Sequence, residues 1–135
     1  MRYLLDTHAW LWAVLGHARL GAAARRALAA VKAGERIGLA AISLKEAAWL
    51  LARGRVVLTK EAAPWAGWLR EAAAAPGLEV LPLTVEVAIE SERFPNSFPK
   101  DPADRLIAAT ARVHDLTLLT GDAALHAQAD VRTLW

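Results

Sequence analysis

Four acidic residues stand at positions where they could act together as ligands for a metal ion. Asp6, Glu46 and Asp122 each follow a short apolar run by a few residues, and Asp104 comes just after a proline-rich loop. Clustered carboxylates repel one another and lose hydration on burial, so such a group is tolerated chiefly when a cation neutralises it. Mg²⁺ or Mn²⁺ fits best, because both prefer oxygen ligands and commonly keep several waters.

The composition limits the other possible sites and the class of protein. With 135 residues, 56% of them hydrophobic and 22% charged, the chain is typical of a folded, helix-rich domain, which we predict to span residues 1–135. The absence of cysteine excludes disulfides and cysteine-ligated zinc or iron–sulfur sites. No apolar run reaches the length of a membrane span, so we expect a cytoplasmic protein with no membrane contact.

The net charge of +2 is unevenly distributed along the chain. Residues 19–60 hold nine Lys or Arg against two Glu, and residues 79–104 hold six acids against two bases. A basic segment facing an acidic one can steer a polyanion toward a metal site, although ordinary solvated helix faces explain the pattern too. The basic residues that could contact a nucleic-acid backbone are Arg25, Arg26, Arg53 and Arg55.

Short apolar runs alternate with helical patterns along the chain. We predict strands at residues 2–5, 36–42, 78–83, 116–119 and 131–134. We predict helices at residues 9–15, 20–33, 43–53, 60–75, 85–92 and 102–114. This alternation indicates an α/β fold with a parallel sheet covered on both faces. In such sheets ligands bind beyond the carboxyl ends of the strands, where the acids stand.

Each acid also has a local explanation as part of a helix start. Ser43 and Glu46 have the spacing of a capping box, and Thr7 and Asp122 are of types that commonly cap helices. Capping and metal binding are compatible, because a helix N-terminus favours an ionised carboxylate. If the acids were only caps, their mutation would cost stability and the protein would bind no Mg²⁺.

Four segments of the chain have a characteristic order and spacing. They are LLDTH at residues 4–8, ISLKE at 42–46, DPADRLIAATA at 101–111 and LTGD at 119–122. Together they resemble the PIN-domain family, and within it the VapC-type toxins of bacterial toxin–antitoxin pairs. The resemblance implies a three-layer α/β/α sandwich with a short parallel central sheet. It also implies a Mg²⁺- or Mn²⁺-dependent endoribonuclease whose acidic quartet is Asp6, Glu46, Asp104 and Asp122.

The same resemblance implies partners and supporting residues. The expected partners are an RNA substrate, a cognate antitoxin and a second copy of the chain in a homodimer. Thr7 and Thr120 resemble hydroxyl neighbours that orient a carboxylate or a water. Asp101 is a further acid, but the Asp101-Pro102 pair favours a helix N-cap. We expect most of the six tryptophans to pack in the core and some to line a partner groove.

The hypothesis for the reaction is metal-assisted hydrolysis. Asp6 and Asp104, assisted by Glu46 and Asp122, would hold one or two Mg²⁺ ions against a scissile phosphate, and a coordinated water would attack in line. The products would carry a 5′-phosphate and a 3′-hydroxyl. We expect His8 to have a supporting or structural role, because a metal site does not need it as a base.

Two alternatives remain open at this stage. A phosphatase of the haloacid-dehalogenase type also begins with a strand ending in Asp, but it expects a second Asp where His8 stands. A catalytically inert PIN-fold module would use the same fold only to hold RNA or a partner. A nicotinamide dinucleotide enzyme is disfavoured, because no GxGxxG follows the first strand.

Overall fold

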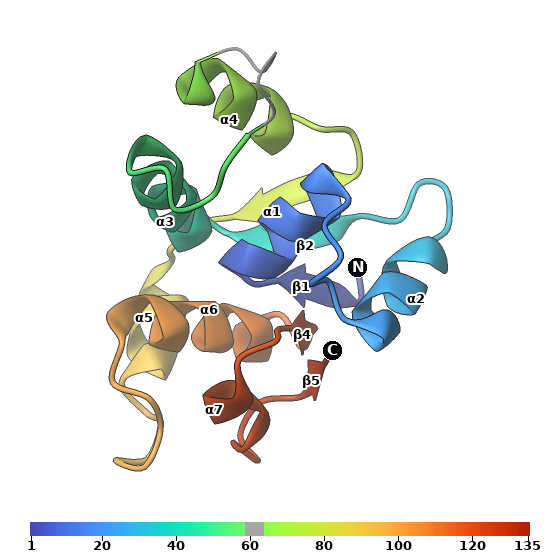
Figure 1. The fold of residues 1–135 in the computed structure, drawn as a ribbon. Coiled ribbons are helices and arrows are strands. Elements are labelled where there is room, and N and C mark those ends of the chain that lie inside the picture. The colour runs from blue at the N-terminus through green and yellow to red at the C-terminus, as the bar shows by residue number, and fades with distance from the viewer. Residues whose placement is uncertain (59–63) are drawn as a thin grey trace.

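A five-stranded sheet forms the centre of the computed structural model, which describes residues 1–58 and 64–135 (Figure 1). The strands are β1 (Tyr3–Leu5), β2 (Ile37–Ala40), β3 (Leu78–Leu81), β4 (Thr117–Leu119) and β5 (Thr133–Leu134). All neighbours pair in parallel, in the order β3-β2-β1-β4-β5. The predicted α/β class with a short parallel sheet is confirmed, and the carboxyl ends of all five strands lie along one edge.

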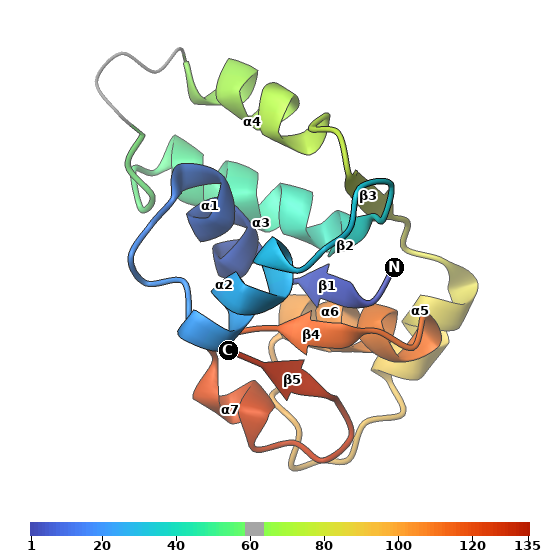
Figure 2. The same cartoon turned by 90° about the vertical axis from the view of Figure 1, so that its right-hand side faces the viewer.

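Helices cover both faces of this sheet. Those described are α1 (Thr7–Leu15), α2 (Ala22–Ala29), α3 (Ala41–Ala52), α4 (Trp65–Ala73), α5 (Val85–Ser91), α6 (Pro102–Val113) and α7 (Ala123–His126). Buried residues of α1, α2, α3 and α4 form one apolar cluster with the sheet, and those of α5, α6 and α7 form another. Figures 1 and 2 show the resulting α/β/α layers, as predicted, with α3 contacting both α1 and α6.

The start of α3 differs from the prediction. The strand predicted at residues 36–42 ends at Ala40, and the helix begins at Ala41, so Ser43 lies inside its first turn. Ala40 is the N-cap and makes no side-chain cap hydrogen bond, so the predicted capping box is wrong. The reason is a tertiary contact: the buried Ser43 hydroxyl lies 3.0 Å from the Thr7 hydroxyl and is not available to cap the helix.

Other differences lie at element ends. The helix α2 is shorter than the predicted 20–33, and α4 covers only part of the predicted 60–75, whose residues 60–63 lie outside the described residues. No range was predicted for α7, because four residues carry little periodic pattern, although its N-cap Asp122 was recognised as a capping type. Within residues 1–58 and 64–135, no helix combines the length and apolar character needed to cross a bilayer.

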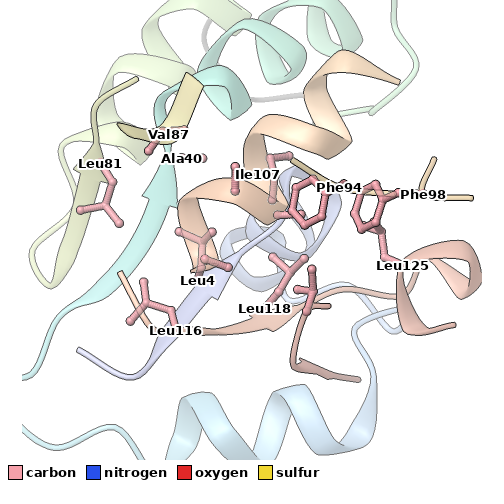
Figure 3. Close-up of a cluster of buried hydrophobic side chains, with 14 residues drawn as sticks. Leu4, Ala40, Leu81, Val87, Phe94, Phe98, Ile107, Leu116, Leu118 and Leu125 are labelled. Atoms are coloured by element: carbon pink, nitrogen blue, oxygen red, sulfur yellow. The ribbon is translucent and has the colours of Figure 1, made fainter. Parts of the chain in front are cut away.

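A buried aromatic pair fixes the proline-rich loop that leads into α6 (Figure 3). The rings of Phe94 and Phe98 stack with centroids 4.1 Å apart, and both side chains are buried among core residues. The Arg105 guanidinium, from the first turns of α6, donates to the carbonyl oxygens of Pro99 at 2.9 Å and Phe98 at 3.3 Å. These contacts hold the loop against α6 and so set the position of Asp104.

We predict that Phe98→Ala lowers the free energy of unfolding by about 3–5 kcal/mol, because it leaves a cavity beneath the loop. Leu83→Ala is the control, since Leu83 is 56% exposed and its truncation should change stability by less than about 0.5 kcal/mol. Urea unfolding of both variants measures the difference. Equal losses would contradict the role given to the aromatic pair.

Candidate active site

The carboxyl edge of the sheet has a natural crevice between β1 and β4. The chain passes from β1 to β2 and β3 on one side, and later returns to β4 on the other side. Figure 2 shows the arrows of β1 and β4 side by side and pointing the same way. Ligands of parallel α/β sheets bind at such a reversal. Asp6 and Thr120 directly follow these two strands, and the Asp6 amide donates to the Leu119 carbonyl at 3.1 Å.

A pocket of about 570 Å³ opens at this edge, and all four predicted acids line it. Asp6 precedes α1, Glu46 lies in α3, Asp104 lies in the first turn of α6, and Asp122 precedes α7. Four elements that are distant in the sequence therefore bring their carboxylates to one place. The expectation that these residues share an edge of the sheet agrees with the structure, and their roles as ligands stay a prediction.

Three acids in this region cap helices. Asp6 and Asp122 each accept one backbone N–H through Oδ1, at 2.8 and 2.9 Å, at the starts of α1 and α7. Asp101 accepts two backbone N–H groups of α6 through Oδ1, at 2.8 and 3.2 Å. Asp101 is therefore the N-cap that the sequence predicted, and it does not line the pocket. Thr7, expected as a cap type, is instead the first residue of α1.

Thr7 connects the first strand end to Glu46. Its Oγ1 atom lies 2.5 Å from Glu46 Oε1 and 3.0 Å from Ser43 Oγ. An ionised carboxylate can only accept, so the Thr7 hydroxyl donates to Glu46 and the Ser43 hydroxyl is left to donate to Thr7. Thr7 and Ser43 are both buried, so this chain of hydroxyl groups fixes the direction in which Glu46 points.

Thr120 plays the corresponding part for the acids that follow β1 and β4. Its buried hydroxyl forms a hydrogen bond with Asp6 and accepts the backbone N–H of Asp122 at 3.1 Å. His126 Nε2 donates to the Thr120 carbonyl, and His126 Nδ1 lies 2.7 Å from the Thr133 hydroxyl. His126 thus ties α7 to β4 and β5. No sequence pattern pointed to this role, because a lone histidine in a short helix has no recognisable pattern.

Burial and mutual repulsion govern the charge of the acids. Burial raises the pKa of Asp6, and the hydrogen bond from Thr120 partly offsets this effect. The pKa of Asp104 is raised to about 7, first by burial and then by the negative charges around it. The carboxylates that repel Asp104 are, from strongest to weakest, Asp101, Asp122, Glu46 and Asp6. A positive charge placed among them would relieve this repulsion.

The acids form an open site and not a closed cage. Among residues 1–58 and 64–135, no three acidic or histidine side chains already converge as a metal-binding cluster. The donors that line the pocket are nevertheless carboxylate oxygens, and the pocket has room for water beside an ion. This donor set fits a hydrated, oxygen-preferring ion, because Mg²⁺ usually keeps several waters and binds through one or two carboxylates.

The predicted basic residues are divided between the pocket and other surfaces. Arg55 lines the pocket, whereas Arg53 lies outside it with its guanidinium 4.7 Å from the Trp49 ring centroid. Arg25 and Arg26 lie on the exposed face of α2 and do not line the pocket. Arg19 does line it and was not predicted to do so, although it begins the basic segment.

Aromatic side chains form the rest of the pocket wall. His8, Trp12 and Trp135 line it together with the acids. His8 was expected near the site, but neither tryptophan was singled out. Their presence depends on how α1 and the segment after β5 meet in space, which single-sequence patterns do not reveal.

Comparisons with known proteins agree with this geometry. The PIN domain profile matches residues 3–131. Ribonuclease VapC22 of Mycobacterium tuberculosis is 37% identical over 134 residues, which cover 98% of this chain and 97% of that protein.

Among solved structures, DNA-bound VapBC from Salmonella typhimurium matches with a TM-score of 0.70 and 18% identity, covering 99% of this chain and 97% of that one. FitAcB from Neisseria gonorrhoeae matches with a TM-score of 0.68 and 24% identity, covering 98% of this chain and 96% of that one. At these identities the structural matches establish the fold alone. Together with the sequence relative and the matched profile, they confirm the resemblance: the chain belongs to the PIN domain family, in its VapC branch.

Proposed function

We propose that this protein is a Mg²⁺-dependent endoribonuclease and the toxin component of a toxin–antitoxin pair. The observation that carries the proposal is the crowding of carboxylates around half-buried Asp104, in an open pocket at the switch point of a parallel sheet. The relative named Ribonuclease VapC22 supports the assignment of RNA as substrate. Mn²⁺ is the alternative ion, since it has the same preference for oxygen.

The four acids and Thr7 each have a defined part in this proposal. Asp6 and Asp104 hold the ion, and Glu46 and Asp122 assist directly or through water. A bound divalent ion would supply an acidified water as nucleophile and would offset the charge that develops on the phosphate. The 2.5 Å hydrogen bond from Thr7 fixes the Glu46 carboxylate, so this carboxylate need not reorient when the substrate binds.

The proposal extends to partners. Solved relatives include complexes named VapBC and FitAcB and a Klebsiella pneumoniae toxin–antitoxin complex. We propose that this chain likewise binds a cognate antitoxin and forms a homodimer. Arg19 and Arg55, at the pocket wall, are placed to contact phosphates of an RNA strand that enters it.

The experiment that tests the proposal is an RNA cleavage assay of the purified protein with Mg²⁺ and with chelator. We predict that Asp6→Asn and Asp104→Asn each lower the cleavage rate by at least about 100-fold, because even outer partners of metal ligands are worth 10- to 100-fold. Glu86→Gln is the matched control, since Glu86 is an exposed acid on α5. It should leave the rate unchanged.

The outcomes separate the competing functions. Cleavage that needs Mg²⁺ and leaves a 5′-phosphate and a 3′-hydroxyl supports metal-assisted hydrolysis, whereas a 2′,3′-cyclic phosphate would exclude it. Activity that survives both substitutions would remove the central proposal. A folded protein that cleaves no RNA would favour the inert binding module, and an aspartyl-phosphate trapped on Asp6 would favour the phosphatase.

The raised pKa of Asp104 predicts the pH dependence of stability without metal. Because this pKa is about 7 in the folded chain and 3.8 ordinarily, the folded state holds the proton more tightly than the unfolded state. The free energy of unfolding should therefore fall as the pH rises from about 4 to about 7. Urea unfolding in the presence of a chelator measures the free energy of unfolding at each pH. In the Asp104→Asn variant this free energy should fall less steeply with rising pH. An equally steep decline in the variant would contradict the prediction.

Thr7 provides a test of positioning. We predict that Thr7→Val lowers the cleavage rate by about tenfold and raises the Mg²⁺ concentration needed for half-maximal rate, because Glu46 loses its hydroxyl partner. Thr7→Ser keeps the hydroxyl and should restore both quantities. If the serine variant were as impaired as the valine variant, the effect would come from packing and not from the hydrogen bond.

A further inference from the structure

The wall of the pocket beside the acids carries a run of aromatic rings. The Trp12 and Trp135 rings lie 5.8 Å apart between centroids at an angle of 54°, and the His8 ring lies 5.3 Å from that of Trp12. All three line the same pocket as the four acids. A polar, negatively charged site is therefore bordered by flat apolar surfaces, which metal binding alone does not require.

Two glycines fix the position of Trp135. A Cβ atom on Gly121 would lie 2.7 Å from the Trp135 ring, and one on Gly21 would lie 2.6 Å from the Trp135 carbonyl carbon. Neither position has room for a side chain, so the indole lies directly against the backbone just before Asp122. The ring is thus held next to one of the acids and cannot easily swing away.

Core packing explains other tryptophans better than these two. Trp10, two residues before Trp12 and on the buried face of α1, is only 2% exposed and does not line this pocket. Trp12 and Trp135 pack against the apolar cluster, and the Trp12 ring also stacks with that of His17, but both tryptophans stay partly exposed and line the pocket. Arg19 and Arg55 line the same pocket. The pocket therefore offers acids, cations and aromatic faces within one space of about 570 Å³.

These three kinds of group match the three parts of a nucleotide. With the scissile phosphate at the acids and flanking phosphates near the arginines, the attached base falls beside the aromatic wall. Aromatic side chains stack on any base, because every base has a π face. Bases in a duplex are covered by their neighbours, so only an unpaired nucleotide can offer its face.

We propose that Trp12 and Trp135 form a stacking site for an unpaired nucleobase next to the scissile phosphate. This inference rests on the proposed ribonuclease function and assigns to these two side chains the contact with the base beside the cut bond. Aromatic rings stack on every kind of base, so the site distinguishes unpaired from paired nucleotides more than it distinguishes one base from another.

The first test uses the unaltered protein and varies the RNA. A short unstructured RNA is cleaved with Mg²⁺, the cut bond is mapped, and each flanking nucleotide is then replaced by an abasic one. We expect one of the two abasic RNAs to lose about tenfold in kcat/KM. Annealing a complementary strand should suppress cleavage. Full activity on both abasic RNAs, or on the duplex, would overturn the inference.

The second test adds protein variants. Trp135→Ala and Trp12→Ala should each lower kcat/KM about tenfold on the intact RNA. On the sensitive abasic RNA they should lower it little further, because the base that these side chains contact is already absent. Trp135→Phe should keep most activity, and Trp65→Ala is the control, since Trp65 is 38% exposed on α4 and outside the pocket. Equal losses on intact and abasic RNA would indicate a merely structural role.

The two proposals fail in different ways. If the unaltered protein shows no Mg²⁺-dependent cleavage, the proposed function fails and the stacking site fails with it. If cleavage occurs and depends on Asp6 and Asp104, but is indifferent to the flanking bases, only the stacking site is wrong.

Discussion

Asp104 is half-buried with four other carboxylates near it, and burial and their repulsion raise its pKa to about 7. A parallel sheet creates this situation, because it sends every strand end to one edge and gathers whatever polar residues follow. The surrounding structure opposes the repulsion. Arg105 and the Phe94–Phe98 pair hold the loop before α6, and hydroxyl groups of Thr7 and Thr120 hold the acids at the strand ends.

Helix capping and the proposed ion binding use different parts of the same side chains. Asp6 and Asp122 each accept a backbone N–H through Oδ1, Asp6 also has a hydrogen bond with Thr120, and each carboxylate has acceptor sites for a further partner. The cap stabilises the start of a helix and fixes the carboxylate against its own rotation. Asp101 differs, because its Oδ1 accepts two N–H groups and the residue lies outside the pocket. Asp101 nevertheless contributes the strongest of the negative charges that act on Asp104.

The sequence predicted those features that local patterns determine. The strands before Asp6 and Asp122 and the cap at Asp101 could be recognised, because each depends on a few neighbouring residues. Ser43 was misassigned as a cap, since its contact with Thr7 exists only when α1 and α3 meet. Contacts between individual side chains of distant elements were not predictable.

The contribution of Trp135 illustrates that limit. It lies against Gly21 and Gly121, which belong to segments that only the folded sheet brings together. Arg19 likewise reaches the pocket through a loop with no distinctive pattern. The acids that line the pocket could thus be named from the sequence. The other residues of the pocket wall, which would determine the choice of substrate, could be identified only from the fold.

The most direct measurement of the central claim is anomalous diffraction from crystals of the protein soaked in Mn²⁺. We expect a peak in the pocket, within coordination distance of carboxylate oxygens of Asp6 and Asp104, and its loss in Asp104→Asn crystals. A soaked crystal with no peak among these acids, or a peak that remains unchanged in the variant, would contradict it.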